Sequence, residues 1–398
     1  MVNGGEFAFA GLPGGVAVSR LCVYDWPAAD SVRGGTPHLH LACSEAYVVT
    51  GGRGAVQTLT TSGYEVTPLV PGTVAWFTPG TVHRLVNEDD LRITVRIQRL
   101  VVRGAPAIGA AGGYGVALAL LQGEREGWTE AEVRAAVARV REARPTAVNL
   151  MVCVDRVMTR FAEGLDAVLA EAAAIQREDV EANRAMGVHG AEWLLKKVGA
   201  DRPLRILTHC NTGALATAGW GTALGVIREL HSRGSVEVVY ADETRPLLQG
   251  SRLTAWELVQ EGIPHYVQAD GAAAGTILRG EIDAAIVGAD RIAANGDTAN
   301  KVGTVGVALA CADAGIPFLV AAPTTTVDLA TATGADIHIE LRSETEVLEW
   351  AGHRTAPTES RGHNPAFDVT PGRLITGLVT ERGVLEISAG ELPGDRLR

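Results

Sequence analysis

The chain has 398 residues, of which 46% are hydrophobic and 20% are charged, and these proportions indicate a globular protein of two or three domains. Its formal net charge of -11 argues against a broad nucleic-acid-binding surface but permits a local basic pocket for a phosphate. The five cysteines show no CxxC spacing, the first residues lack a signal-peptide pattern, and no uninterrupted apolar run reaches membrane-spanning length. We therefore expect a cytoplasmic protein that binds neither nucleic acid nor membrane.

Residues 1–97 have the pattern of an all-β domain. Their short apolar or alternating runs, separated by glycine-containing and Asn-Glu-Asp-Asp turns, lie at 16–24, 46–50, 55–60, 73–77 and 93–97. Many short strands of this kind predict a sandwich or a small barrel. We place the end of this domain at residue 97 because the texture of the sequence changes there.

The next segment, residues 98–200, is predicted to be a helical subdomain. Apolar residues recur with helical spacing through 107–123 and 130–141, and Thr129 is placed as an N-cap with Glu132 three residues later. The stretch from 162 to 197 is rich in Ala and Glu, which favour helix.

Residues 201–398 have the alternating pattern of a Rossmann-like α/β domain. Short apolar runs that predict buried strands lie at 204–208, 236–241, 284–288 and 317–321, with helical stretches between them at 214–233, 251–262 and 302–314. Strands and helices in this order form parallel βαβ units. A ligand of such a sheet binds beyond the carboxyl ends of the strands.

Polar clusters follow these strands where that topology places a ligand. Cys210 ends the first strand before a predicted helix, whose N-terminus would lower the thiol pKa; a buried structural cysteine is the equal alternative. Asp290 follows a later strand and could exchange a proton, although a capping aspartate is the commoner outcome. Asn300 and Lys301 at a predicted helix start, and Arg103 before another helix, either bind phosphate and sugar hydroxyls or face solvent.

Six ordered motifs resemble those of methylthioribose-1-phosphate isomerases. They are RGAPAIG at 103–109, THCNTG at 208–213, DETRPLLQGSRLTAW at 242–256, GADRI at 288–292, NGDTANKVG at 295–303 and NPAFDVTP at 364–371. The resemblance covers about residues 98–390, and six motifs in order are far more specific than any one of them. The wider family also contains ribose-1,5-bisphosphate isomerases and regulatory subunits of a translation-initiation exchange factor.

The resemblance implies roles for the residues at matching positions. Cys210 and Asp290 match the catalytic pair, and the substrate-binding positions match Arg103, Gly104, Ala105, Arg144, Gln249, Asn300 and Lys301. The implied reaction converts an aldose 1-phosphate, S-methyl-5-thioribose 1-phosphate of methionine salvage, into the ketose 1-phosphate without a cofactor. Asp290 would protonate the departing ring oxygen and Cys210 would be the partner acid or base, while hydrogen moves from C2 to C1 as a proton or a hydride. The resemblance also implies a homodimer.

Two other functions fit the same motifs. The chain could bind a sugar phosphate without catalysis as a regulatory protein, although the presence of both Cys210 and Asp290 favours an enzyme. Alternatively the substrate could be ribose 1,5-bisphosphate or a 5-deoxyribose 1-phosphate, and the pocket for the C5 substituent would decide between these sugars.

The N-terminal domain carries a separate candidate metal site. Its HxHxxxxE pattern, followed later by GxxH, resembles the two motifs of cupins, which are β-barrels of the jelly-roll type. The implied ligands His38, His40, Glu45 and His83 supply three imidazoles and a carboxylate, a set that suits Fe, Mn, Ni or Zn. The alternative is a sandwich with surface histidines and no metal. A cupin that acts on the ketose product would make the chain bifunctional.

Overall fold

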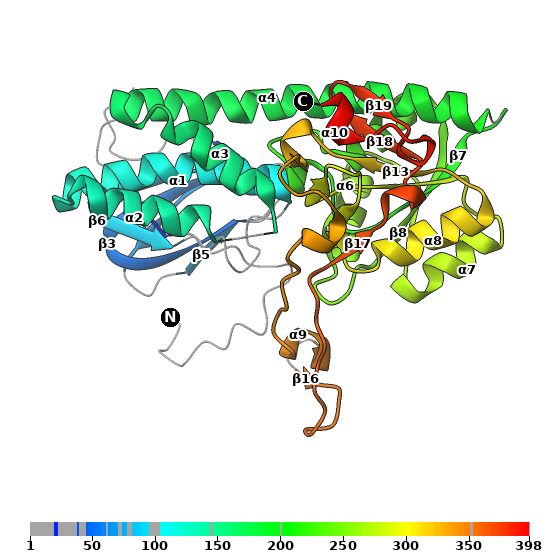
Figure 1. Ribbon diagram of the computed structural model, residues 1–398. Coiled ribbons are helices and arrows are strands. Elements are labelled where there is room, and N and C mark those ends of the chain that lie inside the picture. Colours follow the sequence, from blue (N-terminus) through cyan, green and yellow to red (C-terminus); the bar gives the residue numbers. More distant parts are fainter. Residues whose placement is uncertain are drawn as a thin grey trace. The chain divides into compact units, whose positions relative to one another are not determined.

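The computed structural model describes residues 20–22, 38–39, 45–60, 63–70, 74–77, 82–94, 104–143, 146–199, 201–350 and 353–397 (Figure 1). Internal contacts divide the chain into two compact units, Met1–Val102 and Arg103–Arg398. The second unit contains all six motifs.

The described part of the N-terminal unit is built from antiparallel strands. They are β1 (Arg20–Cys22), β2 (His38–Leu39), β3 (Glu45–Thr60), β4 (Gly63–Leu69), β5 (Val74–Phe77) and β6 (Val82–Thr94). Strand β6 pairs with β1, β2 and β3, and β3 also pairs with β4 and β5. Ala55, Val56 and Leu69 are buried between them. The cupin barrel stays a prediction.

Strand β3 corrects the expectation of a turn near residue 51. The runs at 46–50 and 55–60 were expected to be two strands separated by a Gly-Gly turn, but they form one continuous strand. Its register against β6 shifts three times between Val49 and Gly54. Glycines permit such bulges, so the chain bends within the ladder instead of reversing.

Four helices open the second unit: α1 (Ala105–Glu126), α2 (Glu130–Arg141), α3 (Val148–Met158) and α4 (Leu165–Val198). Thr129 and Glu132 form the expected capping box of α2. Helix α1 is long and apolar enough to cross a membrane, but half of its apolar window is buried inside the protein and it packs on α3 and α4. Helix α4 runs from this helical layer to the far end of the unit (Figure 1).

A seven-stranded sheet forms the second half of this unit, in the order β19-β18-β13-β10-β7-β8-β9. Its strands are β7 (Leu204–Thr208), β8 (Val236–Asp242), β9 (His265–Gln268), β10 (Ala284–Val287), β13 (Phe318–Ala321), β18 (Gly377–Thr380) and β19 (Gly383–Leu385). All pairs are parallel except β18 with β19. The predicted parallel α/β sheet is therefore confirmed.

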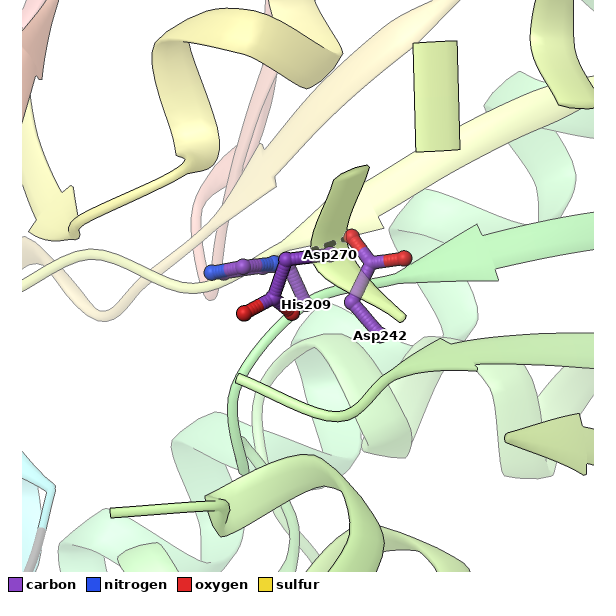
Figure 2. Close-up of side chains that lie close together, drawn as sticks. All are labelled: His209, Asp242 and Asp270. Atoms are coloured by element: carbon purple, nitrogen blue, oxygen red, sulfur yellow. Dashed lines mark hydrogen bonds and ion pairs between the residues drawn. The ribbon is translucent and has the colours of Figure 1, made fainter. Parts of the chain in front are cut away.

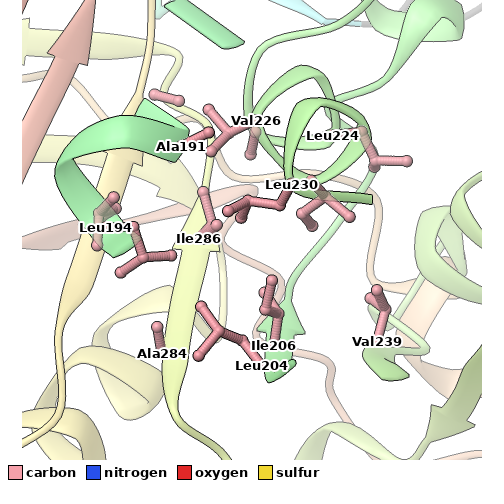
Figure 3. Close-up of a cluster of buried hydrophobic side chains, with 14 of the residues drawn as sticks. Ala191, Leu194, Leu204, Ile206, Leu224, Val226, Leu230, Val239, Ala284 and Ile286 are labelled. Atoms are coloured by element: carbon pink, nitrogen blue, oxygen red, sulfur yellow. The ribbon is translucent and has the colours of Figure 1, made fainter. Parts of the chain in front are cut away.

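Helices cover both faces of the sheet. They are α5 (Ala223–Ser232), α6 (Ala255–Gln260), α7 (Ala273–Leu278) and α8 (Thr304–Ala314). Alternate strand residues face opposite layers: Ile206 packs with α4 and α5 (Figure 3), whereas Leu207 packs with α7 and α8. The strands are hydrophobic on both faces because both are covered.

A second sheet that the sequence did not predict lies beyond the carboxyl end of β10. Its order is β14-β11-β12-β17, formed by β14 (Val327–Asp328), β11 (Arg291–Ala293), β12 (Thr298–Lys301) and β17 (Phe367–Thr370). The remaining described α-helices and strands are α9 (Thr345–Leu348), the antiparallel pair β15 (Glu349–Trp350) and β16 (His353–Arg354), and α10 (Pro393–Arg396).

Two sequence predictions about the motif segments are wrong. Residues 214–233 are not one helix, because a three-residue 3-10 turn, Ala214–Ala216, follows β7 and α5 begins only at Ala223. Cys210 is thus not at an α-helix N-terminus, and the helix-dipole reason for a lowered thiol pKa does not apply. Asn300 and Lys301 lie in β12 and not at a helix start, since their backbones pair with β17 and α8 begins at Thr304.

Candidate active site

Cys210 and Asp290 both lie just beyond the carboxyl ends of strands in the main sheet. Cys210 follows β7, Asp290 follows β10, and these two strands are hydrogen-bonded parallel neighbours. The loops beyond them also touch, because a Cβ placed on Gly288 would lie 2.6 Å from Cγ2 of Thr212. Only glycine at 288 permits this approach, which brings the THCNTG and GADRI motifs together at the carboxyl ends of the strands.

The backbone of Cys210 adopts a left-handed conformation with φ of 66°. This conformation costs an L-residue about 1–2 kcal/mol, so surrounding contacts must hold it. The amide of Cys210 donates to Oγ1 of Thr244 at 2.8 Å, and the carbonyl accepts from Oγ1 of Thr254 at 2.6 Å. Both sides of the residue are therefore fixed by threonine hydroxyls from the DETRPLLQGSRLTAW motif.

Asp290 is half-buried beside the second sheet. Its amide donates to the carbonyl of Ala299 at 2.9 Å, which joins the start of β11 to β12. The guanidinium of the next residue, Arg291, donates to the carbonyl of Thr146 at 3.1 Å and to Asp328 at 3.0 Å. The segment that begins α3 thus lies next to the GADRI motif.

Gly104 brings the RGAPAIG motif to the loop after Cys210. Gly104 has φ of 82°, and a Cβ there would lie 2.1 Å from the carbonyl oxygen of Ala216. Only a glycine fits this contact. Ala105, the next residue, is buried at the start of α1. Arg103 and Arg144 lie outside the described residues, so their phosphate-binding roles stay predictions.

Asn300 and Lys301 are held inside the protein by contacts of their own. Both are buried, Asn300 donates to Oγ1 of Thr304 at 3.0 Å, and the ammonium of Lys301 donates to the carbonyl of Ala366 at 2.9 Å. The same ammonium lies 4.4 Å from the ring centroid of Phe367. A buried cation placed over an aromatic ring is desolvated and pre-positioned, which suits recognition of an anion.

Gln249 is buried and precedes a π-helical turn, Gly250–Thr254. Its Oε1 has no hydrogen-bond partner within the described structure. Single π-turns are rare and are found often at functional sites, and a buried acceptor without a partner is costly. Both features agree with the predicted substrate-binding role of Gln249, which stays a prediction.

His209 precedes Cys210 and is buried, and its ring lies beside the carboxylate of Asp242 (Figure 2). Its Nδ1 lies 2.9 Å from Oδ2 of Asp242, and its Nε2 lies 2.9 Å from the carbonyl of Val302. Burial opposes a charge on the imidazole, but the hydrogen bond and the charge of Asp242 prevail and raise the pKa of His209. Because both ring nitrogens of His209 face oxygen acceptors, the pair of His209 and Asp242 holds a proton next to Cys210 in the sequence.

Comparison with known proteins identifies the family of this chain. The family described as Initiation factor 2 subunit family matches residues 101–387. The chain belongs to this family. A methylthioribose-1-phosphate isomerase from Desulforudis audaxviator (strain MP104C) is 51% identical over 304 residues, which cover 74% of this chain and 85% of that protein. The resemblance drawn from the six motifs is confirmed.

Another relative is longer than this chain. A protein of Nocardia farcinica (strain IFM 10152), named probable bifunctional methylthioribose-1-phosphate isomerase/methylthioribulose-1-phosphate dehydratase, is 53% identical over 302 residues. The match covers 76% of this chain but 54% of that protein, so the chain spans about half the length of this relative.

Solved structures agree with the family assignment. The 5-methylthioribose 1-phosphate isomerase from Pyrococcus horikoshii OT3 superposes with a TM-score of 0.63 at 43% identity, covering 75% of this chain and 86% of that one. The translation initiation factor eIF-2B subunit delta from A. fulgidus superposes with a TM-score of 0.62 at 39% identity, covering 74% and 90%.

The residues that hold the loop after Cys210 in place were not predicted from the sequence. Glu257 is a buried carboxylate that accepts from Asn211 at 2.8 Å, from the amide of Ala214 at 2.8 Å and from Arg228 at 2.7 Å. The available signal was an acid within the apolar helical run AWELV. Through these hydrogen bonds, Glu257 holds the residues directly after Cys210 in place.

The predicted metal ligands of the N-terminal unit are only partly described. His38 and His83 stand directly opposite each other in the register of β2 and β6, and Glu45 is the first residue of β3. His40 lies outside the described residues. The predicted set of three imidazoles and a carboxylate therefore stays a prediction.

Proposed function

We propose that this chain isomerises S-methyl-5-thioribose 1-phosphate to its ketose 1-phosphate, a step of methionine salvage. The observation that carries the proposal is the position of Cys210 and Asp290, on adjoining loops beyond two neighbouring parallel strands. A relative named for this activity, 51% identical over 304 residues, supports the substrate.

We assign complementary roles to the two residues. The anomeric oxygen of the substrate carries the phosphate, so no anomeric hydroxyl proton can be lost to open the ring, and the bond from C1 to the ring oxygen must break with help from an acid. Asp290 gives a proton to that oxygen, the hydrogen on C2 moves to C1, and the proton of the C2 hydroxyl passes to Cys210 as the ketone forms. Return of that proton to Asp290 through solvent closes the cycle. Cys210 is the partner acid or base at C1 and C2. No oxidant or cofactor is required, because the hydrogen atoms are only redistributed.

In this proposal, residues other than Cys210 and Asp290 bind the phosphate and the sugar hydroxyls of the substrate. Lys301, Asn300 and Gln249 contact the sugar phosphate, together with Arg103, Gly104, Ala105 and Arg144. The desolvated ammonium of Lys301 supports this assignment, since a charge in a dry pocket attracts phosphate more strongly than one in water.

The test is turnover of methylthioribose 1-phosphate by the full chain, with Cys210→Ser and Asp290→Asn beside it. We expect conversion by the wild type and a loss of at least 100-fold in kcat for each variant. Ribose 1,5-bisphosphate and 5-deoxyribose 1-phosphate serve as competing substrates, and faster turnover of either would change the assigned sugar. A folded wild type that converts none of the three would contradict the proposal.

Likeness to an initiation-factor subunit favours a second candidate, a regulatory protein that binds a sugar phosphate without converting it. That subunit is 39% identical and superposes with a TM-score of 0.62. Calorimetric titration with the same three sugar phosphates separates the two functions, because the regulatory protein binds one of them and forms no product. Light scattering on the same sample tests the proposed homodimer.

For the N-terminal unit we infer a divalent metal site in a cupin barrel that acts on the ketose product. Two observations support it: His38 and His83 are opposite in register, and the Nocardia relative is named for two successive activities. Metal analysis of the full chain after incubation with Fe, Mn, Ni or Zn should show one equivalent, lost in His38→Ala and His83→Ala. The exposed His353 provides a control variant. Equal metal content in all three variants, or no change in the ketose with metal added, would refute it.

A further inference from the structure

The loop that follows β8 carries a concentration of backbone strain next to Cys210. Thr244 and Leu248 have φ values of 65° and 57°, and the π-turn Gly250–Thr254 follows directly. Positive φ is a genuine outlier for a β-branched residue such as threonine. Strained backbone of this kind persists only where neighbours over-determine it, and it clusters at functional sites.

Asp270 holds Thr244 in its strained conformation. One carboxylate oxygen accepts from the amide of Thr244 at 2.7 Å, and the other accepts from the amide of Arg245 at 2.6 Å. The hydroxyl of Thr244 in turn donates to the carbonyl of Asp242 at 2.9 Å and accepts from the amide of Cys210. The orientation of that hydroxyl is thus fixed by a donor on one side and an acceptor on the other.

Thr254 secures the opposite side of the same peptide. Its hydroxyl accepts from Nδ2 of Asn211 at 3.3 Å and donates to the carbonyl of Cys210. Both Thr244 and Thr254 are completely buried. A buried hydroxyl that loses its partners is costly, so the two threonines and the Cys210 peptide fix one another.

A metal ion is the competing explanation for the acidic residues in this region. His209, Asp242 and Asp270 each offer a ligand atom within 4.8 Å of the others (Figure 2). However, Nε2 of His209 faces the carbonyl of Val302 and must carry hydrogen, so the contact between Nδ1 and Asp242 also needs a proton. Both oxygens of Asp270 already accept backbone amides. These polar atoms are satisfied by the protein itself.

We propose that Thr244 and Thr254 are positioning residues that hold Cys210 in the left-handed conformation required for its thiol to act, with Asp270 behind Thr244. The proposal rests on the isomerase function. Relaxation of φ at Cys210 to a right-handed value would turn the Cα–Cβ bond, and with it the thiol, to another direction. A displacement of about 1 Å of a reacting group can reduce a rate 100-fold.

The experiment compares Thr244→Val and Thr254→Val, which keep the shape and remove the hydroxyl, with Thr244→Ser and Thr254→Ser, which keep the hydroxyl. Thr376→Val is the matched control, because Thr376 also accepts a backbone amide, that of Phe318 at 3.1 Å, but at the opposite end of the sheet. The full-length variants are assayed for kcat, KM and the rate of alkylation of Cys210 by iodoacetamide across pH, resolved by peptide mass spectrometry.

We expect the valine variants to lose 10- to 100-fold in kcat with KM changed less than about threefold, and the serine variants to recover most of it. The alkylation rate of Cys210 at pH 7 should change at least threefold in the valine variants only. Metal content should be below 0.1 equivalent in the second unit, measured in a His38→Ala, His83→Ala background.

Several outcomes would overturn the proposal. Valine variants that match Thr376→Val in kcat and in Cys210 alkylation would exclude a positioning role, and stoichiometric metal lost in Asp270→Asn would favour a metal site instead. If a valine variant does not fold, the serine variant at that position and the valine variant at the other still decide. The alkylation readout is independent of turnover, so an inactive wild type with a valine-sensitive Cys210 would refute the isomerase and leave the positioning role intact.

Discussion

Replacement of Glu257 by glutamine should destabilise the segment after Cys210 by about 3 kcal/mol. The carboxylate of Glu257 is 2% exposed, and it pairs with the guanidinium of Arg228, which is 5% exposed. It also accepts from the amides of Ala214 and Leu215 at 2.8 and 3.3 Å. Removal of one member of a buried ion pair costs about 3–5 kcal/mol. Glu261 still pairs with Arg228, which places the expected cost near the lower end.

The glutamine cannot reorient to avoid this cost. Its amide nitrogen would replace an oxygen that now faces N–H donors, and a Cβ built on Gly213 would lie 2.4 Å from the carboxyl carbon of Glu257, so the pocket has no spare room. A backbone amide left without an acceptor in a buried site costs about 1–3 kcal/mol, which agrees in size with the ion-pair figure.

Hydrogen exchange at the amides of Ala214 and Leu215 measures the free energy of local opening of this segment, separately from unfolding of the N-terminal unit. Glu130→Gln is the control, since Glu130 pairs with Arg134 on the surface at 2.7 Å with both side chains more than half exposed. That pair should contribute no more than about 0.5 kcal/mol. A loss below about 1 kcal/mol for Glu257→Gln, or a loss equal to that of Glu130→Gln, would refute the argument.

Three further outcomes follow from the same structure. Gly104→Ala should destabilise the second unit by at least about 2 kcal/mol and reduce turnover, because the left-handed backbone is strained and the new Cβ overlaps the carbonyl of Ala216; an unchanged urea midpoint would contradict this. Burial raises the pKa of Asp179 to about 6 from 3.8, against two hydrogen bonds that lower it. The wild type should therefore gain about 2 kcal/mol of stability relative to Asp179→Asn as pH falls from 7 to 4, and parallel stability curves would exclude this effect. Burial raises the pKa values of Cys153 and Cys311 to about 12, so neither should react with iodoacetamide at pH 8 in the native protein, as peptide mass spectrometry would show.

The main sheet could be predicted because its strands satisfy a local rule. The runs at 204–208, 236–241 and 284–288 are apolar on both faces, and the structure covers both faces with helices. Strand β12, in contrast, has the sequence TANK, in which neither an alternation nor an apolar run is visible. Its strand conformation comes from pairing with β11 and with β17, which lies more than 60 residues away in the sequence. No local pattern encodes such a partner.

The same limit separates the motif residues from the residues that support them. The topology indicated where Cys210 and Asp290 would lie, because strand ends in a parallel sheet converge, and the resemblance of their motifs to those of the isomerases selected them as the catalytic pair. The supporting contacts of Thr244 and Asp270 link segments 34 and 26 residues apart, and only the folded chain brings them together.

The residue types in the loop after β8, which contacts Cys210, even disfavour the positive φ values that this loop adopts. Threonine and leucine disfavour positive φ, yet Thr244 and Leu248 adopt it, whereas the glycine at 250 has a different purpose. A Cβ at Gly250 would lie 1.6 Å from the carbonyl oxygen of Asp242, so this glycine permits the π-turn to pack on the end of β8. Violations of local preference that tertiary contacts sustain are expected at functional sites. Their concentration within one loop, joined by hydrogen bonds to both sides of Cys210, is the strongest physical reason to regard Cys210 as a reacting group and not as a packed core cysteine.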